Sequence, residues 1–200
     1  MDAQPVRVGV VGDSGVGKSS LVHFLSQGSA LAHPAWTVGC TTQVLVHGDA
    51  TYVELIDVGG HPRYELARAA FYHQLHGIIF VYDQSNRRSY NNLKKWIAEI
   101  NAAQRARGDV FADARLTSLQ QLPTLIVGNK HDLVTPKTKR MTPMQDFKME
   151  SVDASAHACM MDWPRFHLFL DRAAAAINQP LTNTTPKATA RHTKTTSSWW

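Results

Sequence analysis

Gly12-Asp13-Ser14-Gly15-Val16-Gly17-Lys18-Ser19 is the stretch of this 200-residue chain that says most about its fold. It matches the pattern G-x-x-x-x-G-K-[ST], in which glycines let successive backbone N–H groups turn toward a phosphate without obstruction by a Cβ atom. Lys18 can place a positive charge on the β- and γ-phosphate oxygens, and Ser19 can offer its hydroxyl to Mg²⁺. The residues from Asp13 to Ser20 are therefore candidate nucleotide-binding residues.

The segments on either side of this glycine-rich loop have the patterns that such a loop requires. Residues 6–11 (VRVGVV) form a short apolar run of strand type, and residues 19–25 (SSLVHFL) continue with the apolar spacing of a helix. The loop would then open a helix at its positive end, where free N–H groups and the helix dipole both favour phosphate.

Length and composition indicate one globular domain. The chain is 44% apolar and 18% charged, and its formal net charge is +5. Three of these positive charges, Lys187, Arg191 and Lys194, lie in a C-terminal stretch without Asp or Glu, which leaves +2 on residues 1–179. We therefore expect a single domain over residues 1–179 and no nucleic-acid partner.

The cysteines and the N-terminus predict a cytoplasmic, soluble protein. Cys40 and Cys159 are far apart and lack metal-binding spacing, so we expect free thiols in a reducing compartment. The first four residues show neither the apolar core of a signal peptide nor a glycine at position two, and no apolar run has the length of a membrane span.

The rest of the pattern predicts an α/β fold. Residues 41–47 and 51–57 are β-branched runs around a short turn, which indicates a hairpin. Residues 77–83 and 123–128 are continuous apolar runs typical of buried parallel strands, and between them Tyr90, Leu93, Ile97 and Ile100 have helical spacing. We expect a doubly wound, mostly parallel six-stranded sheet with helices on both faces and the ligand at the carboxyl ends of the strands.

The C-terminal half contains an expected surface extension, two expected helices and a tail. Residues 101–122 exceed an ordinary connection and predict a surface extension that is partly helical, and Thr142-Pro143 predicts a short helix through about Glu150. Asp162 is the expected cap of a last helix that Pro180 ends, with an apolar stripe of Phe166, Phe169, Leu170, Ala173 and Ile177. Residues 180–200 are basic and Thr-rich and are expected to be disordered, with Trp199-Trp200 either solvated or an anchor for a partner or membrane interface.

Asp57-Val58-Gly59-Gly60 follows a predicted strand and is a candidate metal and phosphate site. The Asp57 carboxylate would meet Mg²⁺ through water. Gly60 can donate its backbone N–H to a γ-phosphate, so a loop held by that bond would be released when the phosphate leaves.

Asn129-Lys130-His131-Asp132 predicts selectivity for guanine. The carboxylate of Asp132 can accept from both the ring N–H and the exocyclic amine of guanine, whereas adenine offers no such pair of donors. A buried carboxylate left unpaired would therefore select against ATP.

With these motifs the chain resembles the small GTPases of the Ras superfamily, and within it the Rab branch and its Rab-like members, over about residues 6–178. Residues 81–100 (VYDQSNRRSYNNLKKWIAEI) are similar to the corresponding Rab stretch almost residue for residue. The resemblance implies bound GTP or GDP with Mg²⁺, and an effector, an exchange factor and a GTPase-activating protein as partners.

The resemblance also implies roles for single residues. Thr37 matches the threonine that binds Mg²⁺ through its hydroxyl and the γ-phosphate through its N–H. Ser155-Ala156 matches the fifth family motif, in which the Ala156 N–H contacts the guanine carbonyl, and His157 stands where a lysine is usual.

Several positions depart from the family pattern. His61 stands where the family holds the glutamine that positions the attacking water, and no arginine lies between residues 29 and 37, so we expect slow hydrolysis unless a partner supplies an arginine. Ala30 or Leu31 replaces the aromatic residue that covers the base, which predicts weaker base contacts and faster exchange. Ile56 replaces a tryptophan typical of Rabs, and no C-terminal cysteine offers a prenylation site.

Three functions are compatible with this pattern. The first is a GTPase switch with a low intrinsic rate, in which His61, Thr37 and Gly60 surround the reacting phosphate. The second is a scaffold that holds GTP or GDP without hydrolysis and acts through its surface as a dimer. A P-loop kinase or ATPase is a distant third, because Asn129-Lys130-His131-Asp132 has no purpose there.

Overall fold

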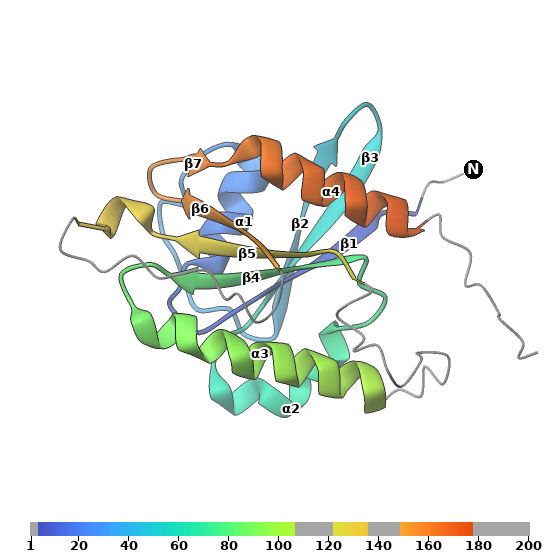
Figure 1. The fold of residues 1–200 in the computed structure, drawn as a ribbon, viewed down its shortest axis with the longest axis horizontal. Coiled ribbons are helices and arrows are strands. Elements are labelled where there is room, and N and C mark those ends of the chain that lie inside the picture. The colour runs from blue at the N-terminus through green and yellow to red at the C-terminus, as the bar shows by residue number, and fades with distance from the viewer. Residues whose placement is uncertain (1–3, 107–121, 136–148, 178–200) are drawn as a thin grey trace, which may run out of the picture.

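The computed structural model describes residues 4–106, 122–135 and 149–177 (Figure 1). Within these residues one sheet has the strand order β2-β3-β1-β4-β5-β6-β7. β2 pairs antiparallel with β3, β7 pairs antiparallel with β6, and the other neighbours are parallel. The strands are β1 (Val6–Val11), β2 (Cys40–His47), β3 (Thr51–Val58), β4 (Gly77–Asp83), β5 (Thr124–Asn129), β6 (Glu150–Ser155) and β7 (Met160–Met161).

The predicted α/β class with a mostly parallel sheet is confirmed, but among the described residues the sheet has seven strands rather than six. The additional strand is β7, in which Met161 pairs with Ala154 and Met160 with Ser155. A strand of two residues is too short to show the alternation that identifies a strand in a sequence.

Helices cover both faces of the sheet, as predicted (Figure 1). α1 (Lys18–Gln27) and α4 (Trp163–Ile177) lie on one face, and α3 (Arg87–Ala106) lies on the other. The short α2 (Glu65–Arg68) stands between two 3₁₀ turns, Pro62–Tyr64 and Ala69–Phe71, and a further 3₁₀ turn spans His131–Leu133. No helix of the described residues is long and apolar enough to cross a membrane.

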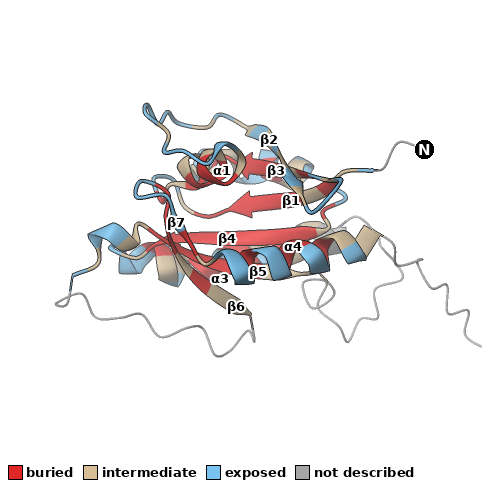
Figure 2. Ribbon diagram, turned by 90° about the horizontal axis from the view of Figure 1, so that it is seen from above, coloured by how far each residue is buried: buried red, intermediate tan, exposed pale blue. Residues whose placement is uncertain are grey.

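Two apolar clusters fill the space between the sheet and its helices, because successive side chains of a strand point to opposite faces. In β4, Ile79 and Val81 belong to the cluster under α1 and α4, whereas Ile78 and Phe80 belong to the cluster under α3. β1, β4 and β5 are buried almost throughout (Figure 2). β2 lies at one edge of the sheet, and none of its residues is fully buried.

Other local predictions have mixed outcomes. The hairpin of β2 and β3 is confirmed, and its turn contains Gly48 in a left-handed conformation (φ 60°). The Asp162 cap is also confirmed, since its Oδ1 accepts from the Arg165 N–H at 3.2 Å. The prediction that a helix extends to about Glu150 is wrong at that end, because Glu150 begins β6. The rest of the predicted helix lies outside the described residues.

The predicted extension at 101–122 begins inside α3, which continues to Ala106. Residues 107–121 and the predicted tail at 180–200 lie outside the described residues. The division into a domain at 1–179 and a tail therefore stays a prediction.

Candidate nucleotide-binding site

The phosphate loop (Gly12–Ser19) follows β1 at the carboxyl edge of the sheet and includes the first two residues of α1, Lys18 and Ser19. Two of its glycines have no room for a side chain. A Cβ atom on Gly12 would lie 2.1 Å from the Val81 carbonyl oxygen, and one on Gly17 would lie 2.5 Å from Nδ2 of Asn129. Both residues also have positive φ angles, 149° and 89°, so glycine is required by conformation as well as by space.

Lys18 is buried under this loop. Its Nζ donates to the carbonyl oxygens of Gly12 (2.9 Å) and Asp13 (3.0 Å). Burial lowers the pKa of Lys18 from 10.5 to about 8, and the nearby carboxylates of Asp57 and Asp13 only partly oppose this effect. The loop therefore holds an amine whose charged form would gain from a nearby phosphate.

Ser19, Thr37 and Asp57 meet below the loop, although they lie far apart in the sequence. The Ser19 hydroxyl donates to Asp57 Oδ2 at 2.6 Å, Thr37 Oγ1 donates to the same oxygen at 3.0 Å, and the two hydroxyl oxygens are 2.9 Å apart. Asp57 is fully buried, and its other oxygen, Oδ1, has no hydrogen-bond partner. Two hydroxyls and a carboxylate with an unpaired oxygen are donors that suit Mg²⁺, which takes oxygen ligands.

A cavity of about 340 Å³ opens beside these residues. Most of the predicted phosphate and metal residues line this cavity, together with Trp36 and Arg63, to which the sequence analysis assigned no role. Its walls comprise Ser14, Gly15, Gly17, Lys18, Ser19, Ser20, Pro34, Ala35, Trp36, Thr37, Val38, Gly60, His61, Arg63, Tyr64 and Lys130.

Gly60 and His61 form the side of the cavity that comes from the loop after β3. The Gly60 backbone packs on the phosphate loop so closely that a Cβ atom there would lie 2.4 Å from the Gly12 carbonyl oxygen. The His61 ring stacks on Trp36, with ring centroids 6.3 Å apart and planes at 29°. Its Nδ1 accepts from the backbone N–H of Arg63 at 3.2 Å.

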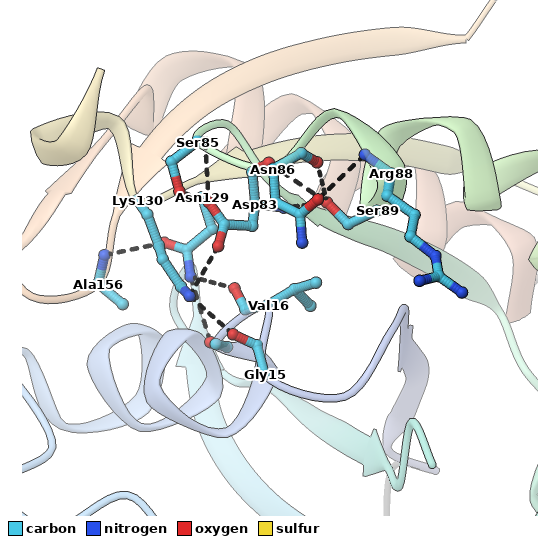
Figure 3. A network of polar contacts seen from close by, with 11 residues as sticks. Gly15, Val16, Asp83, Ser85, Asn86, Arg88, Ser89, Asn129, Lys130 and Ala156 are labelled. Carbon is cyan, nitrogen blue, oxygen red and sulfur yellow. Dashed lines mark hydrogen bonds and ion pairs between the residues drawn. The ribbon is translucent and has the colours of Figure 1, made fainter. Parts of the chain in front are cut away.

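Asn129 and Lys130 join the end of β5 to the phosphate loop (Figure 3). Asn129 Nδ2 donates to the Val16 carbonyl oxygen at 3.0 Å. Lys130 Nζ donates to the Gly15 carbonyl oxygen at 2.7 Å and pairs with Asp83 Oδ2 at 2.8 Å. Partial burial acts to raise the pKa of Asp83, but hydrogen bonds from Lys130 and Ser85 hold it below its usual range.

The other residues predicted to read the base lie next to Asn129 but not in the walls of the cavity. Ser155 Oγ donates to Asp132 Oδ1 at 2.5 Å, and His157 is exposed. The Ala156 N–H, expected on a guanine carbonyl, donates to Asn129 Oδ1 at 3.1 Å in the structure. The base contacts of these residues stay predictions.

The side chain of Asp13 has partners that the sequence analysis did not identify. Its carboxylate accepts from Asn92 Nδ2 at 2.7 Å and from Trp96 Nε1 at 2.8 Å, both on α3. Only the spacing of Asn92 and Trp96, four residues apart on one helical face, could have indicated a shared partner. The phosphate loop is thus fixed to α3 as well as to β5.

An ion pair between buried Arg68 and partly buried Glu99 connects α2 with α3. Arg68 is 3% exposed, and it donates to both carboxylate oxygens of Glu99, at 2.9 and 2.6 Å. The Tyr72 hydroxyl donates to Glu99 as well, at 2.7 Å. The Arg68 guanidinium lies 4.3 Å from the centre of the Trp96 ring and donates to the His61 carbonyl oxygen at 3.0 Å.

A mostly parallel sheet in an α/β fold, with this loop at its carboxyl edge, defines a P-loop nucleotide-binding protein. The sequence model of the Ras family matches residues 7–163, and the chain belongs to this family. The resemblance to Ras-superfamily GTPases is thereby confirmed.

Similar proteins include animal Rab-like proteins and a plant small GTPase. Human Rab-like protein 3 is 41% identical over 152 residues, which cover 68% of this chain and 64% of that protein. Rab-like protein 3 of Danio rerio is 36% identical over 174 residues, or 78% of this chain and 74% of that protein. Small GTPase LIP1 of Arabidopsis thaliana is 42% identical over 146 residues, or 64% of this chain and only 42% of that protein.

Proposed function

We propose that this protein is a Mg²⁺-dependent guanine-nucleotide switch with slow intrinsic GTP hydrolysis. The observation that carries this proposal is the convergence of Ser19, Thr37 and Asp57, with an unpaired oxygen on Asp57. Burying a carboxylate oxygen without a hydrogen-bond partner lowers the stability of the fold. We therefore attribute the unpaired oxygen of Asp57 to a place for a ligand.

In this proposal the chain holds the nucleotide from three sides. Lys18 and the backbone of the phosphate loop bind the β- and γ-phosphates. Ser19 and Thr37 would hold Mg²⁺ directly and Asp57 through water, and the ion would supply positive charge to the phosphate oxygens. Asn129, Lys130, Asp132, Ser155, Ala156 and His157 form the side that receives guanine.

Slow hydrolysis follows from the residue at position 61. A glutamine amide can accept from the attacking water and donate to the transferring phosphoryl group, whereas a neutral imidazole has one acceptor and one donor nitrogen, placed differently. His61 Nδ1 already accepts from Arg63. We propose as partners effectors, an exchange factor and a GTPase-activating protein that supplies an arginine. We also propose that the protein acts in the cytoplasm and that such partners recruit it to membranes.

The nucleotide carried by the purified protein tests the proposal directly. After denaturation and chromatography we expect a guanine nucleotide. If none is retained, direct titration with GTP and ATP in the presence of Mg²⁺ should show binding of GTP only. Binding of ATP in preference to GTP, or of neither, would contradict the proposed function.

Single-turnover hydrolysis separates a slow GTPase from a scaffold. His61→Gln should raise the hydrolysis rate on the order of 10-fold without changing GTP affinity, because the gain acts on water in the transition state. A lower rate would mean that the imidazole itself positions the water. No hydrolysis in either protein, even with an activating partner, would favour the nucleotide-holding scaffold.

A further inference from the structure

We propose that His61 is a fixed hydrogen-bond donor to the terminal phosphate of GTP and takes no proton from the attacking water. This inference rests on the proposed function and specifies how one residue of that site acts. It would make His61 a sensor of the third phosphate, which favours bound GTP over GDP without promoting its hydrolysis.

The 3₁₀ turn that follows His61 determines which nitrogen of its imidazole ring carries the proton. Pro62 has no backbone N–H, so the Arg63 N–H is the first donor of the 3₁₀ turn Pro62–Tyr64 and needs an acceptor. His61 Nδ1 is that acceptor, at 3.2 Å. Because a neutral imidazole carries one proton, an accepting Nδ1 places that proton on Nε2.

The backbone of His61 is held from the opposite side by Arg68. This arginine donates to the His61 carbonyl oxygen at 3.0 Å and is itself fixed by two hydrogen bonds to Glu99. The imidazole also stacks on Trp36 of the facing loop. Cap, carbonyl contact and ring stacking together limit the rotation of the ring.

The position of the ring decides what its free nitrogen can reach. His61 and Lys18 line the same cavity, and the neighbouring Gly60 packs directly on the phosphate loop. An Nε2–H in this wall can donate to a phosphate oxygen. With Nδ1 occupied and Nε2 protonated, the ring offers no lone pair to a water molecule.

The ratio of GTP to GDP affinity tests this role. In Mg²⁺ buffer His61→Ala should lower that ratio on the order of 10-fold, because a hydrogen bond to a charged phosphate oxygen is lost. His61→Gln should keep the ratio, since its amide also donates. His33→Ala, an exposed histidine outside the cavity walls, is the matched control and should change nothing.

An unchanged ratio in His61→Ala would overturn the proposal. If the wild-type protein failed to bind GDP, the proposed function would be refuted instead. Failure of the His61 proposal and failure of the proposed function can therefore be told apart.

Nitrogen NMR of the ¹⁵N-labelled protein bound to GTP shows which ring nitrogen of His61 carries the proton. The His61 signals, assigned by their loss in His61→Gln, should show an unprotonated Nδ1 and a protonated Nε2. A protonated Nδ1, in a neutral or a charged ring, would overturn the inference.

Discussion

GTP affinity should fall about tenfold between pH 7 and pH 9, because Lys18 loses its proton in the free protein over this range. With a pKa of about 8, its amine is about nine-tenths charged at pH 7 and about one-tenth charged at pH 9. A bound phosphate returns the pKa toward its ordinary value, so binding at pH 9 must also take up a proton. The free energy that this proton uptake costs makes the binding free energy less favourable, and the affinity for GTP falls accordingly.

Titration calorimetry at pH 7, 8 and 9, in two buffers with different ionisation enthalpies, measures both quantities. We expect uptake of about 0.1 proton at pH 7 and about 0.9 at pH 9. An affinity that is constant over this range, without proton uptake, would refute the reasoning.

The same burial affects the stability of the nucleotide-free protein. Because the folded pKa of Lys18 lies below its unfolded value, the unfolded chain binds more protons between pH 8 and 10.5, and stability rises with pH there. Lys18→Met removes the charge at similar length. Relative to this variant, the wild-type free energy of unfolding should gain about 3 kcal/mol across the interval.

Three substitutions test other parts of the site. Asp132→Asn should shift preference from GTP toward XTP in competition binding, because an amide donates where the carboxylate accepts; retained guanine preference would exclude Asp132 as the base reader. Ser19→Asn should weaken GTP binding more than GDP binding in calorimetry, since Ser19 would hold the Mg²⁺ ion whose charge would offset the larger negative charge of GTP, and equal losses would contradict this role. Gly60→Ala, whose Cβ would lie 2.4 Å from the Gly12 carbonyl oxygen, should displace the loop and lower GTP affinity relative to GDP; unchanged affinities for both would show that the contact is dispensable.

The central part of the fold could be predicted because its strands are buried on both faces. β4 and β5 appear in the sequence as continuous apolar runs, β1 is a short apolar run of strand type, and the hairpin has β-branched residues around Gly48. β6 and β7 lie at the other end of the sheet. Glu150–Ser155 contains two acidic residues and two serines, and the apparent helix signal at Thr142-Pro143 led the predicted helix into the start of this strand.

The site was predictable where a motif specifies a chemical role and not where contacts are only spatial. Spacing selected Ser19 and Asp57, and the family resemblance added Thr37, and these three side chains do meet. The bond from Trp96 to Asp13 joins residues 83 positions apart, and the stack of His61 on Trp36 joins two irregular loops. The spacing of Asn92 and Trp96 indicates that they could share a partner, but no local periodicity identifies that partner, because it depends on how helices and loops pack.

Trp96 brings the two sides of the site together in one side chain. Its Nε1 donates to Asp13 in the phosphate loop, and its ring lies beneath the Arg68 guanidinium that holds the His61 carbonyl oxygen. The phosphate loop therefore cannot move relative to α3 without changing a charged hydrogen bond, and the His61 backbone cannot move without breaking the contact to a buried arginine. A ligand that alters one loop has a continuous set of packed and polar contacts through which to act on the other, and each of these contacts can be removed singly by mutation.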